Sequence, residues 1–188
     1  VDYEKWNFPS SPDLVPSISG TKVIDEIKPI SVHESISVDK TRPYAEDGAL
    51  VLPTNCGTFY SNQSFSGDYT VEVAAKTNSV FGFLFGSGNP NPCMWQIKPD
   101  NNGALYLHRP GDWTDIKGIF GTPGVDPIND WVHMKIEVKG NHVATYIGDI
   151  LVDEVDLPEG STTGPLGFRT TIDESSTVDY VRVTQNGQ

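Results

Sequence analysis

The sequence has few cysteines, few basic residues and no long hydrophobic run. Its 188 residues include two cysteines, Cys56 and Cys93, which are too few for a disulfide framework and lack the spacing of zinc ligands. Thirteen Lys and Arg stand against twenty-five Asp and Glu, so the formal net charge is -12 at pH 7. A surface this acidic repels phosphate backbones and anionic lipid, and we therefore expect neither nucleic acid nor a membrane as a partner. The longest apolar run, Val80–Phe85, is far shorter than the ~20 residues that cross a bilayer.

The aromatic content and the pattern of short apolar runs predict one folded, all-β domain. Four Trp, seven Tyr and eight Phe are typical of a globular chain and exclude a disordered one. No stretch keeps a helical period beyond about two turns. We expect strands at Ala49–Leu52, Thr58–Ser61, Tyr69–Lys76, Val80–Phe85, Met94–Lys98, Ala104–His108, Trp131–Val138, His142–Ile147, Ile150–Val155, Leu166–Thr171 and Thr177–Thr184. Short strands with Gly, Pro, Asn and Asp between them predict a two-sheet antiparallel β-sandwich.

The first part of the chain differs in composition from the rest. Prolines are frequent within the first thirty residues, among Ser and Asp, and only Lys22–Ile27 and Ile30–Val38 resemble short strands. We therefore predict an extended N-terminal arm or linker with edge strands over residues 1–43, and a β-sandwich domain over residues 44–188.

Two features suggest that the protein is secreted. The chain begins without Met and without a charged-then-apolar signal segment, so we interpret it as a mature or excised fragment. The glycosylation sequon Asn62-Gln63-Ser64 fits a secreted protein. We expect an extracellular location.

Strand alternation places a set of polar side chains on one outer face of the sandwich. In Phe81–Phe85 the Phe residues point one way and Gly82 points the other, and the same sorting sends Trp95 inward and Gln96 outward. The resulting face is floored by Gly82 and Gly167 and carries Gln96, Lys98, Tyr106, His108, Arg169 and Thr171. Fixed donors and acceptors suit sugar hydroxyls, and an aromatic ring suits the C–H face of a pyranose. The pattern therefore predicts a sugar-binding sheet.

A loop residue offers an aromatic platform at the rim of this face. Trp113 follows His108-Arg109-Pro110-Gly111 and lies among Gly, Asp and Thr, where it has no evident role in the core. We therefore expect Trp113 to contact the ligand. The predicted ligand-binding residues are Gln96, Tyr106, His108, Arg109, Trp113 and Arg169.

The order of short motifs along the chain carries a family resemblance. The motifs are Ser66-Gly67-Asp68-Tyr69-Thr70-Val71-Glu72-Val73, Phe81-Gly82-Phe83-Leu84-Phe85, Met94-Trp95-Gln96, Trp131-Val132-His133-Met134-Lys135-Ile136-Glu137-Val138-Lys139-Gly140, Thr145-Tyr146-Ile147-Gly148, Gly167-Phe168-Arg169 and Asp179-Tyr180-Val181-Arg182-Val183. This order resembles the concanavalin A-like (laminin-G-like) jelly-roll modules over roughly Tyr44–Gln188. Within that group it is most similar to accessory modules of glycoside hydrolases such as α-L-rhamnosidases and to the fructan-binding modules of levanases. The sequence departs from the pattern at Gly148-Asp149, where these modules usually have Asp-Gly.

The resemblance implies a two-sheet jelly roll with a sugar site on its concave face or at the rim. Several such modules also hold a structural calcium near the residue that matches Asp179. Asp173-Glu174, Asp179 and Glu46-Asp47 supply hard oxygen ligands that could meet if the first and last strands are adjacent. The alternative is an acidic surface that holds no ion.

The cysteines leave two possibilities open. Cys56 and Cys93 each lie near the start of an expected strand, beside turn residues. They can form a disulfide if those strands are neighbours, and are otherwise buried thiols.

One string resembles a catalytic motif. Glu154-Val155-Asp156-Leu157-Pro158-Glu159 has the Glu-x-Asp-x-x-Glu pattern of the laminarinase and lichenase family, in which a retaining mechanism uses a pair of carboxyls. Pro158 lies inside the motif, where a central strand cannot spare a backbone donor. The motif also runs into a turn, on strands whose outer face is charged. We therefore interpret it as a charged strand end rather than a catalytic strand.

Three functions remain from these observations. The first is a non-catalytic, lectin-like module of a secreted glycoside hydrolase that binds plant or microbial polysaccharide and holds the enzyme near it. The second is a small jelly-roll hydrolase or lyase that uses Glu154 and Glu159, or His108 and Tyr106. The third is a structural domain that packs on a neighbouring catalytic domain. The lack of a carboxylate pair on the predicted sugar-binding face favours the first and third, and we expect a binding module rather than an enzyme.

Overall fold

The computed structural model describes residues 14–17, 23–29, 40–86, 93–97, 105–108, 115–119 and 128–185, and it describes side chains in 40–86, 93–97 and 128–185. These described residues form strands and turns without any helix, so the predicted all-β class is confirmed. No helix in this part of the chain is long and apolar enough to cross a membrane.

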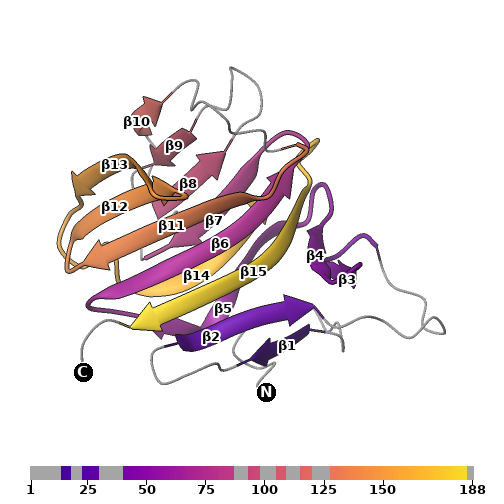
Figure 1. Cartoon of the computed structure of the whole chain (residues 1–188), viewed down its shortest axis with the longest axis horizontal. Helices are drawn as coiled ribbons and strands as arrows, with labels where there is room; N and C mark the ends of the chain where they lie inside the picture. Colours follow the sequence, from indigo (N-terminus) through magenta and orange to yellow (C-terminus); the bar gives the residue numbers. More distant parts are fainter. Residues whose placement is uncertain are drawn as a thin grey trace.

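The described strands form two antiparallel sheets that stack as a sandwich (Figure 1). The larger sheet contains β1 (Leu14–Ser17), β2 (Val23–Pro29), β3 (Tyr44–Glu46), β4 (Ala49–Leu52), β6 (Tyr69–Thr77), β11 (Val132–Lys139), β12 (His142–Ile147), β13 (Ile150–Asp156) and β15 (Ser176–Gln185). The smaller sheet contains β5 (Gly57–Phe65), β7 (Phe81–Phe85), β8 (Cys93–Ile97), β9 (Leu105–His108), β10 (Asp115–Ile119) and β14 (Gly164–Thr170). The main path of the larger sheet is β1-β2-β15-β6-β11-β12-β13, and the smaller sheet runs β10-β9-β8-β7-β14-β5. The predicted two-sheet sandwich is confirmed.

The core lies between the sheets and follows the predicted alternation. In β11 every second residue, from Val132 to Val138, is buried in the core, while the intervening side chains are exposed or half-exposed. In the smaller sheet the inward positions carry large rings, which include Phe83, Trp95 and Phe168. Burying a side chain of this kind contributes roughly 1.5–3 kcal/mol, so these rows fix which face of each strand points inward.

The N-terminal strands extend the larger sheet at its edge. β2 pairs with β15, and β1 pairs with β2 (Figure 1). The expected strand at Ile30–Val38 lies outside the described residues. The division between an arm over residues 1–43 and a domain over residues 44–188 stays a prediction.

Three described strands, β1, β3 and β10, escaped the sequence analysis. β10 pairs with β9 at the edge of the smaller sheet, with a register irregularity between Asp115 and Lys117. The five residues Asp-Ile-Lys-Gly-Ile include Asp and Gly, which are depleted in strands, so the sequence carries little signal there.

The cysteines do not form a disulfide with each other, which corrects the possible bridge. Cys93 lies in β8, whereas Cys56 directly precedes β5, and β7 and β14 lie between these strands. Neighbouring strands are about 4.8 Å apart, so the two residues are separated by more than the ~7 Å that a disulfide allows between Cα atoms. Cys93 is a fully buried thiol, and Cys56 is half-buried with its Sγ 3.4 Å from the carbonyl oxygen of Thr41.

We expect the two thiols to differ in reactivity. Burial raises the pKa of the Cys93 thiol, so the reactive thiolate is scarce in the folded protein. An aromatic disulfide reagent should therefore label one thiol per folded chain, at Cys56, and two thiols per chain unfolded without reductant. The control Cys56→Ser should show no fast labelling when folded. Zero labelling of the unfolded wild type would mean that the cysteines are bridged, contrary to the structure.

Replacing Gly86 by Ala should destabilise the fold. Gly86 has a φ of 76°, and a Cβ built there would overlap the carbonyl oxygen of Ser161. Gly140 has a φ of 61° and nothing within 4 Å of such a Cβ, so Gly140→Ala is the matched control. The left-handed backbone costs about 1–3 kcal/mol in either variant, and only Gly86→Ala adds the overlap. Urea unfolding should therefore give a larger loss of unfolding free energy for Gly86→Ala. Equal losses would contradict the close approach to Ser161.

Candidate functional site

Backbone register brings four predicted positions into one row across the smaller sheet. Arg169 in β14 pairs with Gly82 in β7, Gly82 pairs with Gln96 in β8, and Gln96 pairs with Tyr106 in β9. Thr58 in β5 completes the row opposite Arg169. Residues that are directly opposite in antiparallel strands share a face, so the row is continuous.

A second row lies beside the first. Gly167 pairs with Leu84, Leu84 with Met94, and Met94 with His108. Tyr60 in β5 lies opposite Gly167 at the edge of the sheet. We name the outer surface formed by the described side chains of both rows the Arg169 face; it consists of Thr58, Tyr60, Gly82, Leu84, Met94, Gln96, Gly167 and Arg169.

The accessible part of the Arg169 face lies over β14 and β5. Gln96 is 5% exposed and Met94 is 1% exposed, although neither belongs to the core between the sheets. Tyr60 and Arg169 are half-buried, and Thr58 is exposed. A ligand can therefore reach Arg169 and Tyr60 directly, while Gln96 lies beneath the surface.

Contacts on two sides hold the Arg169 guanidinium. One terminal nitrogen, Nη1, donates to the Met94 Sδ at 3.3 Å, and Nη2 lies 3.8 Å from the Glu174 carboxylate. Glu174 is itself held, because its other oxygen accepts the backbone N–H of Thr171 at 2.8 Å. The arginine is thus oriented before any ligand arrives, which lowers the entropy cost of binding.

Gly82 leaves room for the Met94 side chain next to the arginine. A Cβ at Gly82 would lie 3.3 Å from the Met94 Sδ and 3.7 Å from the Arg169 Cβ. The first distance is tight and the second is an ordinary van der Waals contact, so a side chain at this position would press on the Met94 sulfur. The glycine therefore lets the Met94 sulfur reach the guanidinium.

Tyr60 is a residue of this face that the sequence analysis missed. A Cβ at Gly167 would lie 2.8 Å from the Tyr60 Cδ1, so one edge of the ring occupies the space that a side chain would fill. Burial raises the pKa of the Tyr60 hydroxyl, which therefore stays protonated at neutral pH. The available signal was the strand Thr58–Ser61, in which Phe59 points inward and the alternation sends Tyr60 outward.

Several predicted ligand contacts lie beyond the described side chains. Tyr106 and His108 are placed only as register positions in β9, and Arg109, Trp113 and Lys98 lie outside the described residues. Their roles in binding stay predictions, as does that of Gln96.

The predicted calcium ligands have other contacts or lie apart. Asp179 is exposed at a register irregularity between Val178 and Tyr180. The Glu46 carboxylate lies 2.7 Å from Lys40, and that of Glu174 lies against Arg169. Within the described ranges, no three His, Cys, Asp or Glu side chains gather in a way that could hold a metal ion. A calcium ion near Asp179 stays a prediction of the resemblance.

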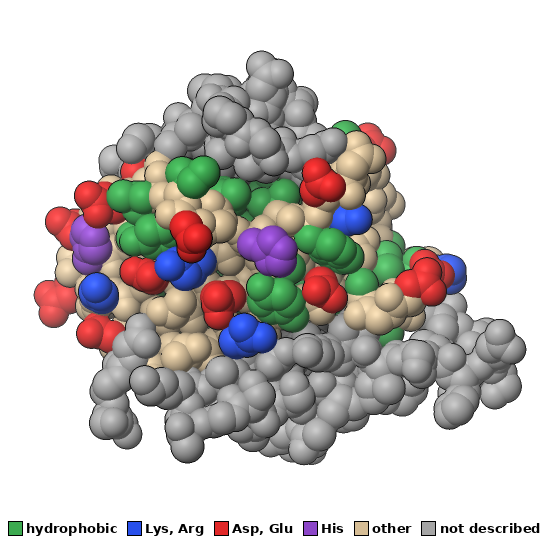
Figure 2. All heavy atoms as spheres, viewed as in Figure 1, with side chains coloured by type: hydrophobic (Ala, Val, Ile, Leu, Met, Phe, Trp, Pro, Cys, Tyr) green, Lys and Arg blue, Asp and Glu red, His purple; other side chains and the backbone are tan. Residues whose placement is uncertain are grey.

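The outer face of the larger sheet is charged, as the alternation predicted (Figure 2). Cations and carboxylates pair along it: Lys135 lies 2.9 Å from Glu137, and Arg182 lies 3.7 Å from Glu72. Such half-exposed pairs contribute little stability each, about 0–1 kcal/mol, but they leave the face nearly neutral along these strands.

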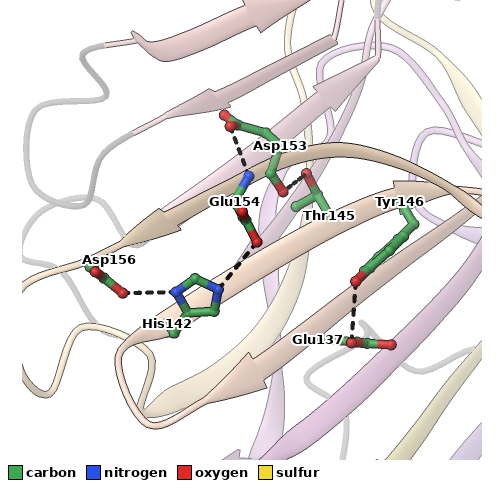
Figure 3. A network of polar contacts seen from close by, with 7 residues as sticks. All are labelled: Glu137, His142, Thr145, Tyr146, Asp153, Glu154 and Asp156. Carbon is green, nitrogen blue, oxygen red and sulfur yellow. Dashed lines mark hydrogen bonds and ion pairs between the residues drawn. The ribbon is translucent and has the colours of Figure 1, made fainter.

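The Glu-x-Asp-x-x-Glu string lies on this charged face, at the end of β13 and in the turn that follows. Glu154, Asp156 and Glu159 are all exposed. The His142 ring lies between two of them, 2.8 Å from Asp156 through Nδ1 and 3.7 Å from Glu154 through Nε2 (Figure 3). The carboxylates of Glu154 and Asp156 thus contact a histidine of the neighbouring strand on an exposed surface. The structure agrees with the prediction of a charged strand end.

Solved structures share the fold of this chain at low sequence identity. The carbohydrate-binding module CBM66 from Bacillus subtilis is 17% identical with a TM-score of 0.57, covering 72% of this chain and 86% of the module. The Bacillus licheniformis β-glucanase is 14% identical with a TM-score of 0.60, covering 94% of this chain and 100% of the enzyme. The alginate lyase AlgAT5 of polysaccharide lyase family 7 is 13% identical with a TM-score of 0.59, covering 84% of this chain and 85% of the lyase. At these identities the likeness establishes the concanavalin A-like jelly-roll fold alone, which confirms the resemblance found in the sequence.

A family model matches most of the chain. The comparison with curated proteins found no match to this chain. The model of the 3-keto-alpha-glucoside-1,2-lyase-like domain matches residues 28–183, which include most strands of both sheets. The chain therefore belongs to the family of 3-keto-alpha-glucoside-1,2-lyase-like domains.

Proposed function

We propose that this domain binds saccharides without catalysis, on the Arg169 face of the smaller sheet. The observation that carries the proposal is the single row in which Arg169, Gly82 and Gln96 lie side by side. An oriented guanidinium offers several N–H donors in a fixed geometry, which suits the neighbouring hydroxyls of a sugar ring. The glycine beside it lets the Met94 sulfur hold the guanidinium in this orientation.

The composition of the face supports binding over hydrolysis. A glycosidase of the common type needs two carboxyl groups flanking the scissile bond. The described side chains of the two rows include no carboxylate. Glu174 lies nearby, but it is held by Arg169 and by the backbone of Thr171.

A lyase is the second candidate function. The description of the family favours it, because it names a lyase acting on 3-keto-glucosides. Elimination needs a base rather than a carboxylate pair, and the register positions of Tyr106 and His108 continue the two rows of the Arg169 face. Analysis of the products distinguishes the two candidate functions. A lyase releases an unsaturated sugar, whereas a binding module leaves its ligand intact.

The proposal includes attachment of this domain to a secreted enzyme. A binding module attached to a secreted glycoside hydrolase would raise the local concentration of polysaccharide around the enzyme. The fold of the CBM66 module and the acidic charge are compatible with an extracellular setting of this kind.

We expect Arg169→Ala to weaken saccharide binding about 10- to 100-fold, because a hydrogen bond from a charged donor contributes about 1.5–3 kcal/mol. Affinity gels over a panel of plant and microbial polysaccharides, with and without calcium, identify the ligand, and calorimetric titration measures the change. The control is Arg182→Ala, which removes an ion-paired arginine from the outer face of the larger sheet.

Equal affinity in the two variants would remove the Arg169 face from the proposal. If the wild-type protein binds no polysaccharide, the proposal fails and a role in packing against another domain takes its place. Appearance of an unsaturated sugar product from a 3-keto-glucoside would establish the lyase instead.

Glu154→Ala should leave saccharide binding unchanged. Its carboxylate is exposed on the other sheet and lies 3.7 Å from His142, away from the Arg169 face. Titration of the variant against the same ligand checks this. A β-glucanase activity that wild type has and Glu154→Ala lacks would instead make the Glu-x-Asp-x-x-Glu string catalytic.

A further inference from the structure

Tyr60 is positioned as a second ligand contact beside Arg169. Tyr60 lies opposite Gly167 and Arg169 lies opposite Thr58, so Tyr60 and Arg169 are diagonal neighbours on one face. Diagonal neighbours in an antiparallel pair are roughly 7–8 Å apart. One sugar ring can therefore touch both side chains at the same time.

The ring of Tyr60 is seated by a glycine. Its Cδ1 and Cε1 atoms would lie 2.8 and 3.2 Å from a Cβ at Gly167, and the carbonyl oxygen of Phe59 approaches the same point. Only glycine leaves the ring edge this space. The ring is half-buried at the edge strand of the smaller sheet, so the rest of it faces solvent.

The hydroxyl of Tyr60 is also available to a ligand. No residue of the described part forms a hydrogen bond with it. With its pKa raised by burial, it remains a neutral group that can donate and accept. Tyr60 thus combines an apolar surface with one polar atom, as a sugar requires.

We propose that Tyr60 stacks on the ligand and selects six-membered sugar rings that have an unbroken face of C–H groups. This inference rests on the proposed saccharide binding at the Arg169 face. A pyranose with equatorial hydroxyls presents axial C–H groups to an aromatic ring while its hydroxyls reach sideways to the Arg169 guanidinium. A furanose ring has no comparable flat C–H face, so it loses the contact with Tyr60.

The test compares two sets of oligosaccharides of equal length, one of glucopyranose units and one of fructofuranose units, by calorimetric titration. Wild type should bind the pyranose set more tightly. Tyr60→Ala should lose at least about tenfold in affinity for it, and Tyr60→Phe, which keeps the ring, about threefold. Tyr180→Ala is the control, because Tyr180 is a half-buried tyrosine beside Arg182 on the other sheet.

The outcomes separate this inference from the proposed function. Wild type that binds fructofuranose equally or better, or Tyr60→Ala that binds like wild type, overturns the inference and leaves saccharide binding standing. Wild type that binds neither these sets nor any polysaccharide overturns both.

A measurement on the wild-type protein covers the case in which Tyr60→Ala does not fold. Saturation-transfer NMR of the bound pyranose should give its strongest signals from the ring protons of one face. Signals spread evenly over the sugar would contradict stacking on Tyr60.

Discussion

The packing of Phe168 against Phe83 in the core is the constraint on which the outer surface depends. These residues lie directly opposite each other in β14 and β7, with ring centroids 5.6 Å apart and nearly edge-to-face. Because side chains alternate along a strand, an inward Phe168 forces Gly167 and Arg169 outward. A slip of one residue would bury the arginine and expose the ring, and the cost of burying an unpaired charge excludes that register. The hydrophobic interior thus fixes the position of the polar group on the far side of the same strand.

The two glycines of the Arg169 face shape the surface around that position. Gly82 allows the Met94 sulfur to approach the guanidinium, and Gly167 allows the Tyr60 ring to lean over β14. Neither glycine has a left-handed backbone, so conformational freedom does not account for them. Close approach of neighbouring side chains does. The two glycines are therefore required for the space that they leave. A methyl group at either position would displace the neighbouring Met94 or Tyr60 side chain without changing the strand pairing.

Alternation allowed the sequence to predict the fold and to place Gly82, Gln96 and Arg169 on one face, because successive side chains of a strand point to opposite faces. It could not predict that Gln96 is buried, since the period identifies a face but not what lies above it. Tyr60 was missed although alternation within Thr58–Ser61 already sends it outward. Its position opposite Gly167 was not predictable, because that position depends on the pairing of β5 with β14. The contact of His142 with Asp156 was also not predictable, because it depends on which residues of β12 and β13 face each other. Pairing between strands is a tertiary property, and single-strand patterns do not contain it.

The charge balance of the Arg169 face argues for a neutral ligand. The whole chain carries a net charge of -12, so an anionic polymer approaches it against a repulsive field that salt screens only beyond about 8–10 Å. An isolated arginine could overcome this locally, but the Glu174 carboxylate lies 3.8 Å from the Arg169 guanidinium and offsets its charge. What remains for a ligand is the directional hydrogen bonding of the guanidinium and the apolar ring of Tyr60. Because Glu174 already offsets the charge of the guanidinium and the chain as a whole is acidic, the proposed saccharide binding is expected to favour neutral sugars over uronates and phosphates.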